Sequence, residues 1–162
     1  KNMEENEKEI KDFFECMGEI WRDITAIEFL MRCALAQKNG DVNLLPQPPY
    51  TKGKSYTQYP ESFSFKYFNE VAKEFNKEFP ELAIKQDLIN FRNAMAHGII
   101  AKINGSNFDQ LVKFKEIKKG NKKIMRVEFS MSLEMGRIKK TRKSLMKLRR
   151  RIALEASDSK NK

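Results

Sequence analysis

Hydrophobic positions near the start of the chain predict one long helix. Over residues 4–37 they recur at steps of three and four, which places them on one side of an α-helix. This stripe consists of Ile10, Phe13, Met17, Ile20, Ile24, Ile27, Met31 and Leu35. Phe14, Trp21 and Leu30 widen it, as burial among several helices requires. The pair Asn39-Gly40 then favours the end of the helix.

The same periodicity predicts two shorter helices, over residues 62–79 and 81–97. Ser62 is a suitable N-cap for the first, and Pro80 separates the two. The side chains expected to face inward are Phe65, Phe68, Val71, Ala72, Phe75 and Phe79, followed by Leu82, Ile84, Leu88, Ile89, Phe91 and Met95. Gly98 fits the left-handed residue that commonly follows a helix.

The segment 39–62 is expected to form no helix, because it contains four prolines. It also holds three tyrosines, together with Lys52 and Lys54. Such a long connection either packs along the surface through its aromatic side chains or contacts single-stranded RNA. Of the two alternatives, the surface loop anchored by its aromatic side chains is favoured.

After Gly98 the period of apolar positions changes from that of a helix to that of a strand. Residues 99–103, 111–118 and 122–130 are expected to be extended, with a hairpin turn at Gly120-Asn121. A last helix follows over about residues 131–155. Its apolar positions are Met131, Met135, Ile138, Leu145, Leu148 and Ile152. Residues 156–162 are expected to be a frayed tail.

These elements predict a mainly α protein. We expect an antiparallel bundle of about four helices, with a small β-hairpin or meander inserted at 99–130 before the last helix. The chain of 162 residues is long enough for one domain with its own core, and a single domain over 1–162 is expected.

The charge is unevenly placed along the chain. The net charge is +10, yet the first 20 residues hold seven acids against three bases, whereas residues 137–151 hold nine bases and no acid. This asymmetry favours a polyanionic partner, nucleic acid first and an anionic membrane second, over a merely solvated helix face. The candidate RNA-binding residues are Arg137, Lys139, Lys140, Arg142, Lys143, Lys147, Arg149, Arg150 and Arg151.

Several observations indicate a cytoplasmic protein. No apolar run is long enough to cross a membrane, and the charged opening residues are not a secretory signal. The two cysteines, Cys16 and Cys33, lie in one predicted helix, too far apart along its axis for a disulfide. No metal site is predicted, because the chain has one histidine and scattered carboxylates.

The only histidine lies in the string Asp87-Leu-Ile-Asn-Phe-Arg92-Asn93-Ala-Met-Ala-His97-Gly98. An imidazole exchanges protons readily near neutral pH, and a guanidinium stabilises phosphate charge. Asn93, four residues before His97, lies beside it on a helix and can orient the ring or contact a phosphate. RNA cleavage requires a base, an acid and a cation, which a symmetric dimer would supply from two copies.

This Arg-Asn-x3-His string on a helix resembles the signature of HEPN (higher eukaryotes and prokaryotes nucleotide-binding) domains, many of which are ribonucleases. The resemblance implies a homodimer that joins two copies of the Arg92–His97 helix in a composite cleft. His97 would then transfer protons, Arg92 would stabilise the phosphate, and Asn93 would position one of them. The expected products are a 2′,3′-cyclic phosphate and a 5′-hydroxyl, with no metal or other cofactor.

The resemblance also implies a setting in toxin–antitoxin or phage-defence systems, with an antitoxin or another regulatory protein as a further partner. Some toxin members of the family carry a tyrosine two residues after the histidine. Ile99 stands at that position, so regulation by tyrosine modification is not expected.

Two other hypotheses stay open at this point. In the first, the chain is a non-catalytic RNA- or protein-binding bundle that uses its basic last helix, while Arg92 and His97 are structural, the histidine as a capping cation. In the second, the basic amphipathic helix lies on an anionic membrane surface. The apolar stripe of that helix lacks tryptophan and phenylalanine, which favours the bundle over the membrane.

Overall fold

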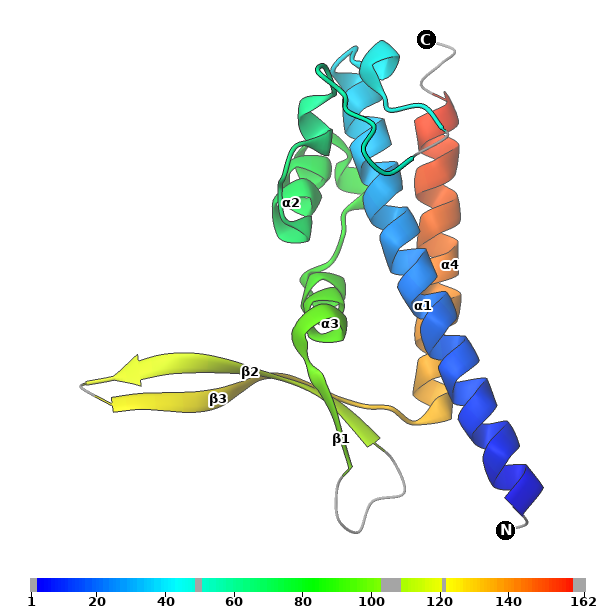
Figure 1. The fold of residues 1–162 in the computed structure, drawn as a ribbon, viewed down its shortest axis with the longest axis vertical. Helices are drawn as coiled ribbons and strands as arrows, with labels where there is room; N and C mark the ends of the chain where they lie inside the picture. Colours follow the sequence, from blue (N-terminus) through cyan, green and yellow to red (C-terminus); the bar gives the residue numbers. More distant parts are fainter. Residues whose placement is uncertain (1–2, 49–50, 103–108, 121, 159–162) are drawn as a thin grey trace. The chain divides into compact units, whose positions relative to one another are not determined.

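The chain is mainly α-helical, with a small sheet before its last helix. A computed structural model describes residues 3–48, 51–102, 109–120 and 122–158, and side-chain burial between residues 7 and 155 of these ranges. Its elements are α1 (Met3–Lys38), α2 (Phe68–Glu78), α3 (Gln86–His97), β1 (Ile99–Lys102), β2 (Asp109–Lys119), β3 (Lys122–Ser132) and α4 (Met135–Asp158) (Figure 1). This order confirms the mainly α class and the position of the predicted β insertion.

The chain divides into two compact units. Unit 1 comprises Lys1–Arg22 and Lys85–Leu145, and unit 2 comprises Asp23–Ile84 and Met146–Lys162. Helices α1 and α4 each contribute one part to both units. The single domain over residues 1–162 stays a prediction.

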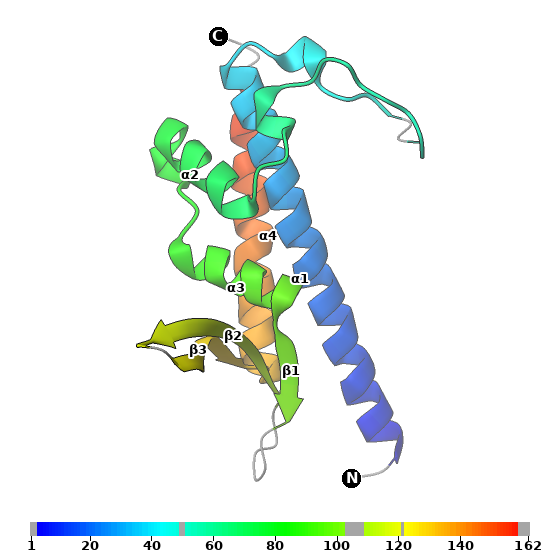
Figure 2. The same ribbon diagram turned by 60° about the vertical axis from the view of Figure 1, so that its left-hand side comes forward.

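The sheet of unit 1 is an antiparallel meander in the order β1-β2-β3. Ile99 pairs with Val112 and Leu111 pairs with Met131, while the register is irregular between Lys113 and Phe114. Helix α3 packs on β2 and β3, where the rings of Phe91 and Phe129 lie 6.3 Å apart. Beyond this contact the two strands continue as a two-stranded arm that leaves α3 (Figures 1 and 2). We call residues 114–120 and 122–127 the arm.

The helical part of unit 1 buries only some of the predicted apolar stripe of α1. Met17 and Ile20 are buried, and on α4 so are Ile138 and Leu145. The prediction is wrong nearer the N-terminus, where Ile10 is 56% and Phe14 65% exposed. Helical periodicity identifies an apolar face, but burial also requires an element that covers it.

In unit 2, α1 and α2 share an apolar core. The buried side chains include Ile24, Ile27, Met31 and Leu35 of α1 and Phe68, Val71, Ala72 and Phe75 of α2. Ile152 of α4 is also fully buried. The Asp23 carboxylate is 2% exposed and accepts a hydrogen bond of 2.7 Å from Nη1 of Arg149, which joins α1 to α4.

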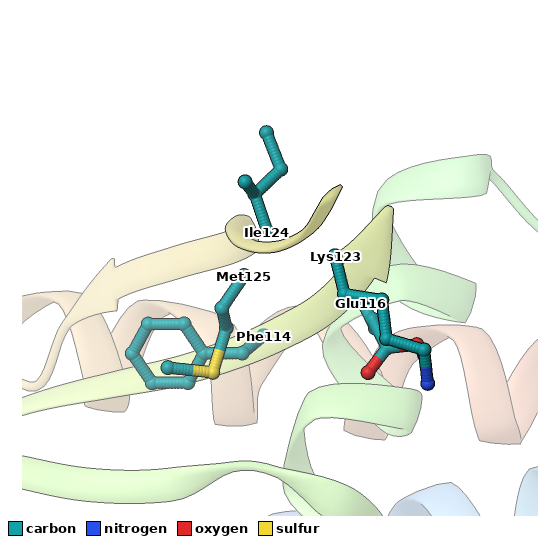
Figure 3. Close-up of a pocket in the computed structure, with 5 residues that line it drawn as sticks. All are labelled: Phe114, Glu116, Lys123, Ile124 and Met125. Carbon is teal, nitrogen blue, oxygen red and sulfur yellow. The ribbon is translucent and has the colours of Figure 1, made fainter. Parts of the chain in front are cut away.

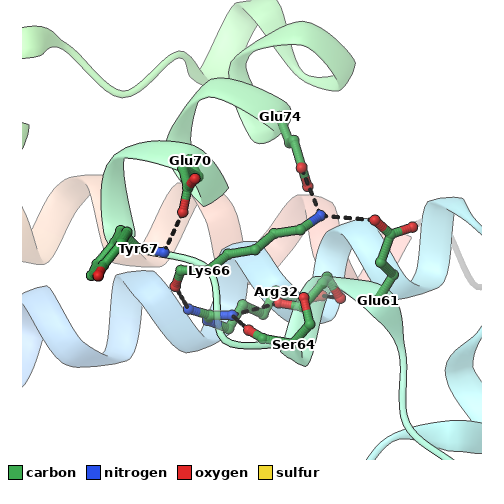
Figure 4. Close-up of polar contacts among 8 residues, drawn as sticks. Arg32, Glu61, Ser64, Lys66, Tyr67, Glu70 and Glu74 are labelled. Carbon is green, nitrogen blue, oxygen red and sulfur yellow. Dashed lines mark hydrogen bonds and ion pairs between the residues drawn. The ribbon is translucent and has the colours of Figure 1, made fainter.

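Helix α2 begins at Phe68, six residues later than predicted. Ser62 is not its N-cap but lies in a 3₁₀ turn, where its hydroxyl donates to the carbonyl of Arg32. The Arg32 guanidinium in turn donates to the carbonyls of Ser62, Ser64 and Lys66 (Figure 4). These bonds hold the chain in a non-helical path until Tyr67.

Phe65 lies in this stretch and is fully exposed, so its predicted inward position is also wrong. The proline-rich segment before it contains a further 3₁₀ turn at Val42–Leu44, where no helix was expected. Pro49 and Tyr50 of that segment lie outside the described residues.

Two further helix starts differ from the prediction. Residues Pro80–Leu82 form a 3₁₀ turn, and α3 begins only at Gln86, because the side chain of Asn76 bonds both the N–H and the carbonyl of Ile84. Met131 belongs to β3, so α4 begins at Met135, and it runs past the predicted start of the tail to Asp158. Residues 159–162 of the predicted tail, and Asn121 of the predicted turn, lie outside the described residues.

Candidate functional site

Helix α3 carries the three candidate catalytic residues. His97 is its last residue and is exposed, whereas Arg92 and Asn93 are half-buried. Phe91 and Ala94 are buried, which anchors the helix on the rest of unit 1. The predicted position of His97 in the last turn of a helix is therefore confirmed.

Helix geometry sets how these side chains are grouped. Asn93 lies one turn before His97 and on the same side of α3. Arg92 is turned from His97 by about 140° around the axis, so these two side chains do not share one face of the helix. In the described part of the chain no hydrogen bond engages the His97 imidazole, which leaves the ring open to a ligand.

Gly98 fixes the main chain directly after His97, although not as predicted. Its backbone is extended, with φ −89° and ψ −179°, so the expected left-handed conformation is wrong. Its N–H donates to the carbonyl of Ala94 at 2.7 Å. A Cβ at this position would lie within 3.0 Å of the carbonyl oxygens of Ala94 and Val112. Glycine is therefore required by the close approach of α3 and β2.

Apolar side chains follow the histidine. Ile99 is 55% and Ile100 52% exposed, and both lie on β1, at an edge of the sheet. The predicted strand indicated these residues, but not that both would face solvent.

The nine candidate RNA-binding residues of α4 fall into two groups. Three are engaged within the units, since Arg142 pairs with Glu19, Arg149 pairs with Asp23, and Arg151 donates to the carbonyl of Glu81. The side chains of the other six, Arg137, Lys139, Lys140, Lys143, Lys147 and Arg150, are exposed. Helical spacing places most of the exposed group opposite the buried stripe of Ile138, Leu145 and Ile152.

Unit 1 has a second basic surface, on the arm, which the sequence analysis did not single out. Residues 115–126 hold six bases and one acid. A hollow of about 290 Å³ on the arm is lined by Phe114, Glu116, Lys123, Ile124 and Met125. Figure 3 shows Met125 beside the Phe114 ring, and Glu116 beside Lys123. Nζ of Lys123 lies 3.0 Å from Oε1 of Glu116. Six bases within twelve residues were the available signal.

Other kinds of site find less support. Cys16 and Cys33 are both free, and burial raises the pKa of the Cys33 thiol, which makes it a weaker nucleophile at neutral pH. Among the described residues, no three histidine, cysteine or acidic side chains lie close enough together to hold a metal ion. No helix within the described ranges is long and apolar enough to cross a membrane.

Comparison with known proteins gives no relative. No family model matches the chain, and no characterised protein or solved structure matches it significantly.

Proposed function

We propose that this protein is a metal-independent endoribonuclease of the HEPN type. The observation that supports this most is an exposed imidazole at the end of α3, with the half-buried Arg92 and Asn93 in the turn before it. The main chain around the histidine is fixed by β1 and Gly98, so a rigid element presents the group that would transfer protons.

The proposed reaction is an internal phosphoryl transfer within RNA. His97 of one copy takes the proton of a 2′-hydroxyl, whose oxygen attacks the adjacent phosphorus. The bond to the 5′-oxygen breaks, and that oxygen receives a proton from the protonated His97 of the second copy. Arg92 stabilises the negative charge on the phosphoryl oxygens. The products are a 2′,3′-cyclic phosphate and a 5′-hydroxyl.

The proposal requires two copies of α3 in one assembly, because one imidazole cannot be base and acid in the same step. A two-fold axis beside α3 would supply both. As part of the same proposal, the four helices form an antiparallel bundle, and the protein acts in the cytoplasm. There it serves a toxin–antitoxin or phage-defence system, where an antitoxin or another regulatory protein restrains it.

The test is RNA cleavage in EDTA. The parent protein should leave cyclic phosphate ends, whereas His97→Ala and Arg92→Ala should each lose at least about a hundredfold in rate, as expected when a general acid–base group is removed. Lys85→Ala, an exposed basic residue just before α3, is the matched control and should cleave like the parent. An inactive parent protein, or equal rates in all four proteins, would reject the proposal.

A second function is favoured by the exposed basic residues of α4. In this alternative the protein binds RNA or a protein without catalysis, and the Arg92–His97 pair is structural. It predicts that His97→Ala changes stability but not RNA affinity, whereas reversal of the charges of Lys139, Lys143 and Lys147 abolishes binding. Measuring affinity and cleavage on the same variants separates the two functions.

A further inference from the structure

One face of α3 carries uncharged polar side chains that lead to the histidine. Its residues follow one another at steps of four, three and four, and they are Gln86, Asn90, Asn93 and His97. Helical geometry places them within about 60° of one another around the axis, over a length of about 16 Å. Gln86, Asn90 and His97 are exposed, and Asn93 is half-buried. We call Gln86, Asn90 and Asn93 the amide stripe.

Two amides of the stripe are bonded to each other in a fixed arrangement. Nε2 of Gln86 donates to Oδ1 of Asn90 at 3.0 Å. This bond leaves Oε1 of Gln86 as an acceptor and Nδ2 of Asn90 as a donor. Within the described ranges, no other hydrogen bond engages either amide. The pair therefore presents a donor and an acceptor to a ligand in solvent.

The exposed asparagine of this pair adds little to the stability of α3. The helix is anchored by Ile89, Phe91 and Ala94, which are buried and lie outside the stripe. Asparagine is a weaker helix former than lysine, arginine or glutamate, which suit an exposed helical position better. A hydrogen bond between side chains four residues apart contributes little on a helix surface. The choice of asparagine at position 90 therefore favours a role in binding over a role in folding.

The chemistry of the pair selects a nucleobase rather than a phosphate. Neutral amides do not offset the charge of a phosphate, and Asp87, exposed directly after Gln86, repels it. A donor beside an acceptor matches the edge of a base instead. Adenine offers its N6 amino group beside a ring nitrogen that accepts, and asparagine and glutamine are its usual partners in nucleic-acid recognition. The pair thus fits adenine.

We propose that Gln86 and Asn90 recognise an adenine of a single-stranded RNA substrate. The inference rests on the proposed function, in which RNA is the substrate, and adds a base preference to it. Asn90 lies about 10 Å and Gln86 about 16 Å along the axis from His97, so the adenine lies a few nucleotides from the cleaved phosphodiester. The substrate is single-stranded because a duplex hides these base edges from a helix surface.

Contacts to a base and contacts to the backbone have different consequences. Phosphate contacts raise the affinity for every RNA, whereas base contacts raise it for one sequence. Loss of the Gln86 and Asn90 amides should therefore abolish a preference for adenine and leave the affinity for other RNA unchanged. Alanine is a better helix former than either residue, so the substitutions should not unfold α3.

The test is RNA binding by His97→Ala protein, which should leave the RNA uncleaved, read by fluorescence anisotropy. The probes are an oligouridine and the same oligouridine with one adenosine. The adenosine probe should bind at least about tenfold more tightly, as expected for a paired contact to a base edge. Adding Gln86→Ala and Asn90→Ala should reduce its affinity to that of oligouridine. Asn69→Ala, at an exposed asparagine of α2, is the matched control and should keep the preference.

A third probe tests the contact at the level of atoms. Purine riboside in place of the adenosine lacks the N6 amino group, and it should bind no better than uridine. If His97→Ala protein is unstable, 2′-O-methyl probes, which lack the attacking hydroxyl, allow the same comparison with the parent protein. None of these measurements requires cleavage, so they can succeed or fail whether or not the protein is a ribonuclease.

Three outcomes would overturn this proposal. The first is equal affinity of the starting protein for the oligouridine and adenosine probes. The second is an equal loss of affinity for both probes in the alanine variant, which would assign the amides to the RNA backbone. The third is an unchanged preference with weaker self-association in sedimentation equilibrium, which would assign them to a contact between two copies of the chain.

Discussion

At the scale of single residues, long-range neighbours decide what each position tolerates. Gly98 adopts an extended backbone that any residue can adopt, so its conformation does not demand glycine. The demand comes from the carbonyl oxygens of Ala94 and Val112, which occupy the space of a side chain. A substitution of Gly98 therefore tests steric crowding rather than backbone strain.

Gly98→Ala should destabilise the protein by about 1 to 3 kcal/mol, because the added methyl group forces α3 and β2 apart. Gly136→Ala is the control, since nothing lies within 4 Å of a Cβ there, and it should cause no loss of stability. Urea unfolding of both variants measures the difference. Equal midpoints for the two variants would show that the junction relaxes without cost.

The left-handed conformation predicted for Gly98 was wrong, and this shows why the role of some residues could not be predicted from the sequence. A glycine after an apolar helix is typical of a left-handed cap, and only the approach of Val112, 14 positions further along the chain, reveals another reason. Ser62 and Phe65 were misplaced for a similar cause. Their local pattern fits a helix, but hydrogen bonds from Arg32, 30 or more residues earlier, hold the chain otherwise.

At the scale of elements, α4 divides its basic residues between structure and surface. Arg149 neutralises a carboxylate that is almost fully buried, while its neighbour Arg150 is exposed. The two arginines are adjacent in sequence and equal in charge. Substituting each arginine in turn therefore separates the contribution of this helix to stability from its contribution to binding.

Arg149→Ala should lower the free energy of unfolding by about 2 to 3 kcal/mol, since it leaves Asp23 without this cation. This loss of stability is smaller than that expected for a fully buried ion pair, because the Arg149 side chain is 30% exposed. Arg150→Ala should change stability by less than about 0.5 kcal/mol. Thermal unfolding of both variants measures this, and similar midpoints would contradict the structural role of Arg149.

The stability of the strands at the base of the arm is expected to depend on pH. Hydrogen bonding from Lys113 holds the pKa of the Glu128 carboxyl below its usual range, with a smaller effect of Lys115. Because the folded pKa is depressed, the stabilisation is complete above the ordinary glutamate pKa and is lost as the pH falls through the folded value. Carboxyl-carbon NMR should show the depressed pKa. Lys113→Ala should return it toward the ordinary value, and an unchanged titration would refute the ion pair.

The existence of the elements could largely be predicted, whereas their starts could not. The long first helix and the β2–β3 hairpin each repeat one period over ten or more residues, and local periodicity specifies both. The apolar side chain of Met131 fits the end of a strand and the first turn of a helix equally well. Only the pairing of Leu111 with Met131 resolves that ambiguity.

At the scale of the whole molecule, the net charge of +10 predicts salt-sensitive RNA binding. Replacing Lys139, Lys140 and Lys143 with alanine should reduce the slope of log affinity against log salt by roughly 2 for single-stranded RNA. Alanine at Lys73, Lys77 and Lys85, also exposed, is the matched control and should leave the slope unchanged. Fluorescence anisotropy across a salt series provides the measurement, and equal slopes would exclude phosphate contacts by α4.

The candidate site was predictable as far as it depends on one helix. The regular apolar pattern predicts one helix, α3, and this helix contains Arg92, Asn93 and His97. The arm was predicted as a hairpin but not as a surface. Phe114 and Met125 are exposed because no other described element packs on them. The local sequence pattern does not predict such missing long-range contacts.

The junction between α3 and β1 has a consequence for any molecule that reaches His97. The Gly98 N–H is bonded back to the helix, and Ile99 is already paired with Val112, so the main chain on the C-terminal side of the histidine is immobilised. A ligand then needs to restrict only the two torsions of the imidazole side chain. The entropy lost at this residue on complex formation is correspondingly small, and encounter leads directly to a reactive orientation.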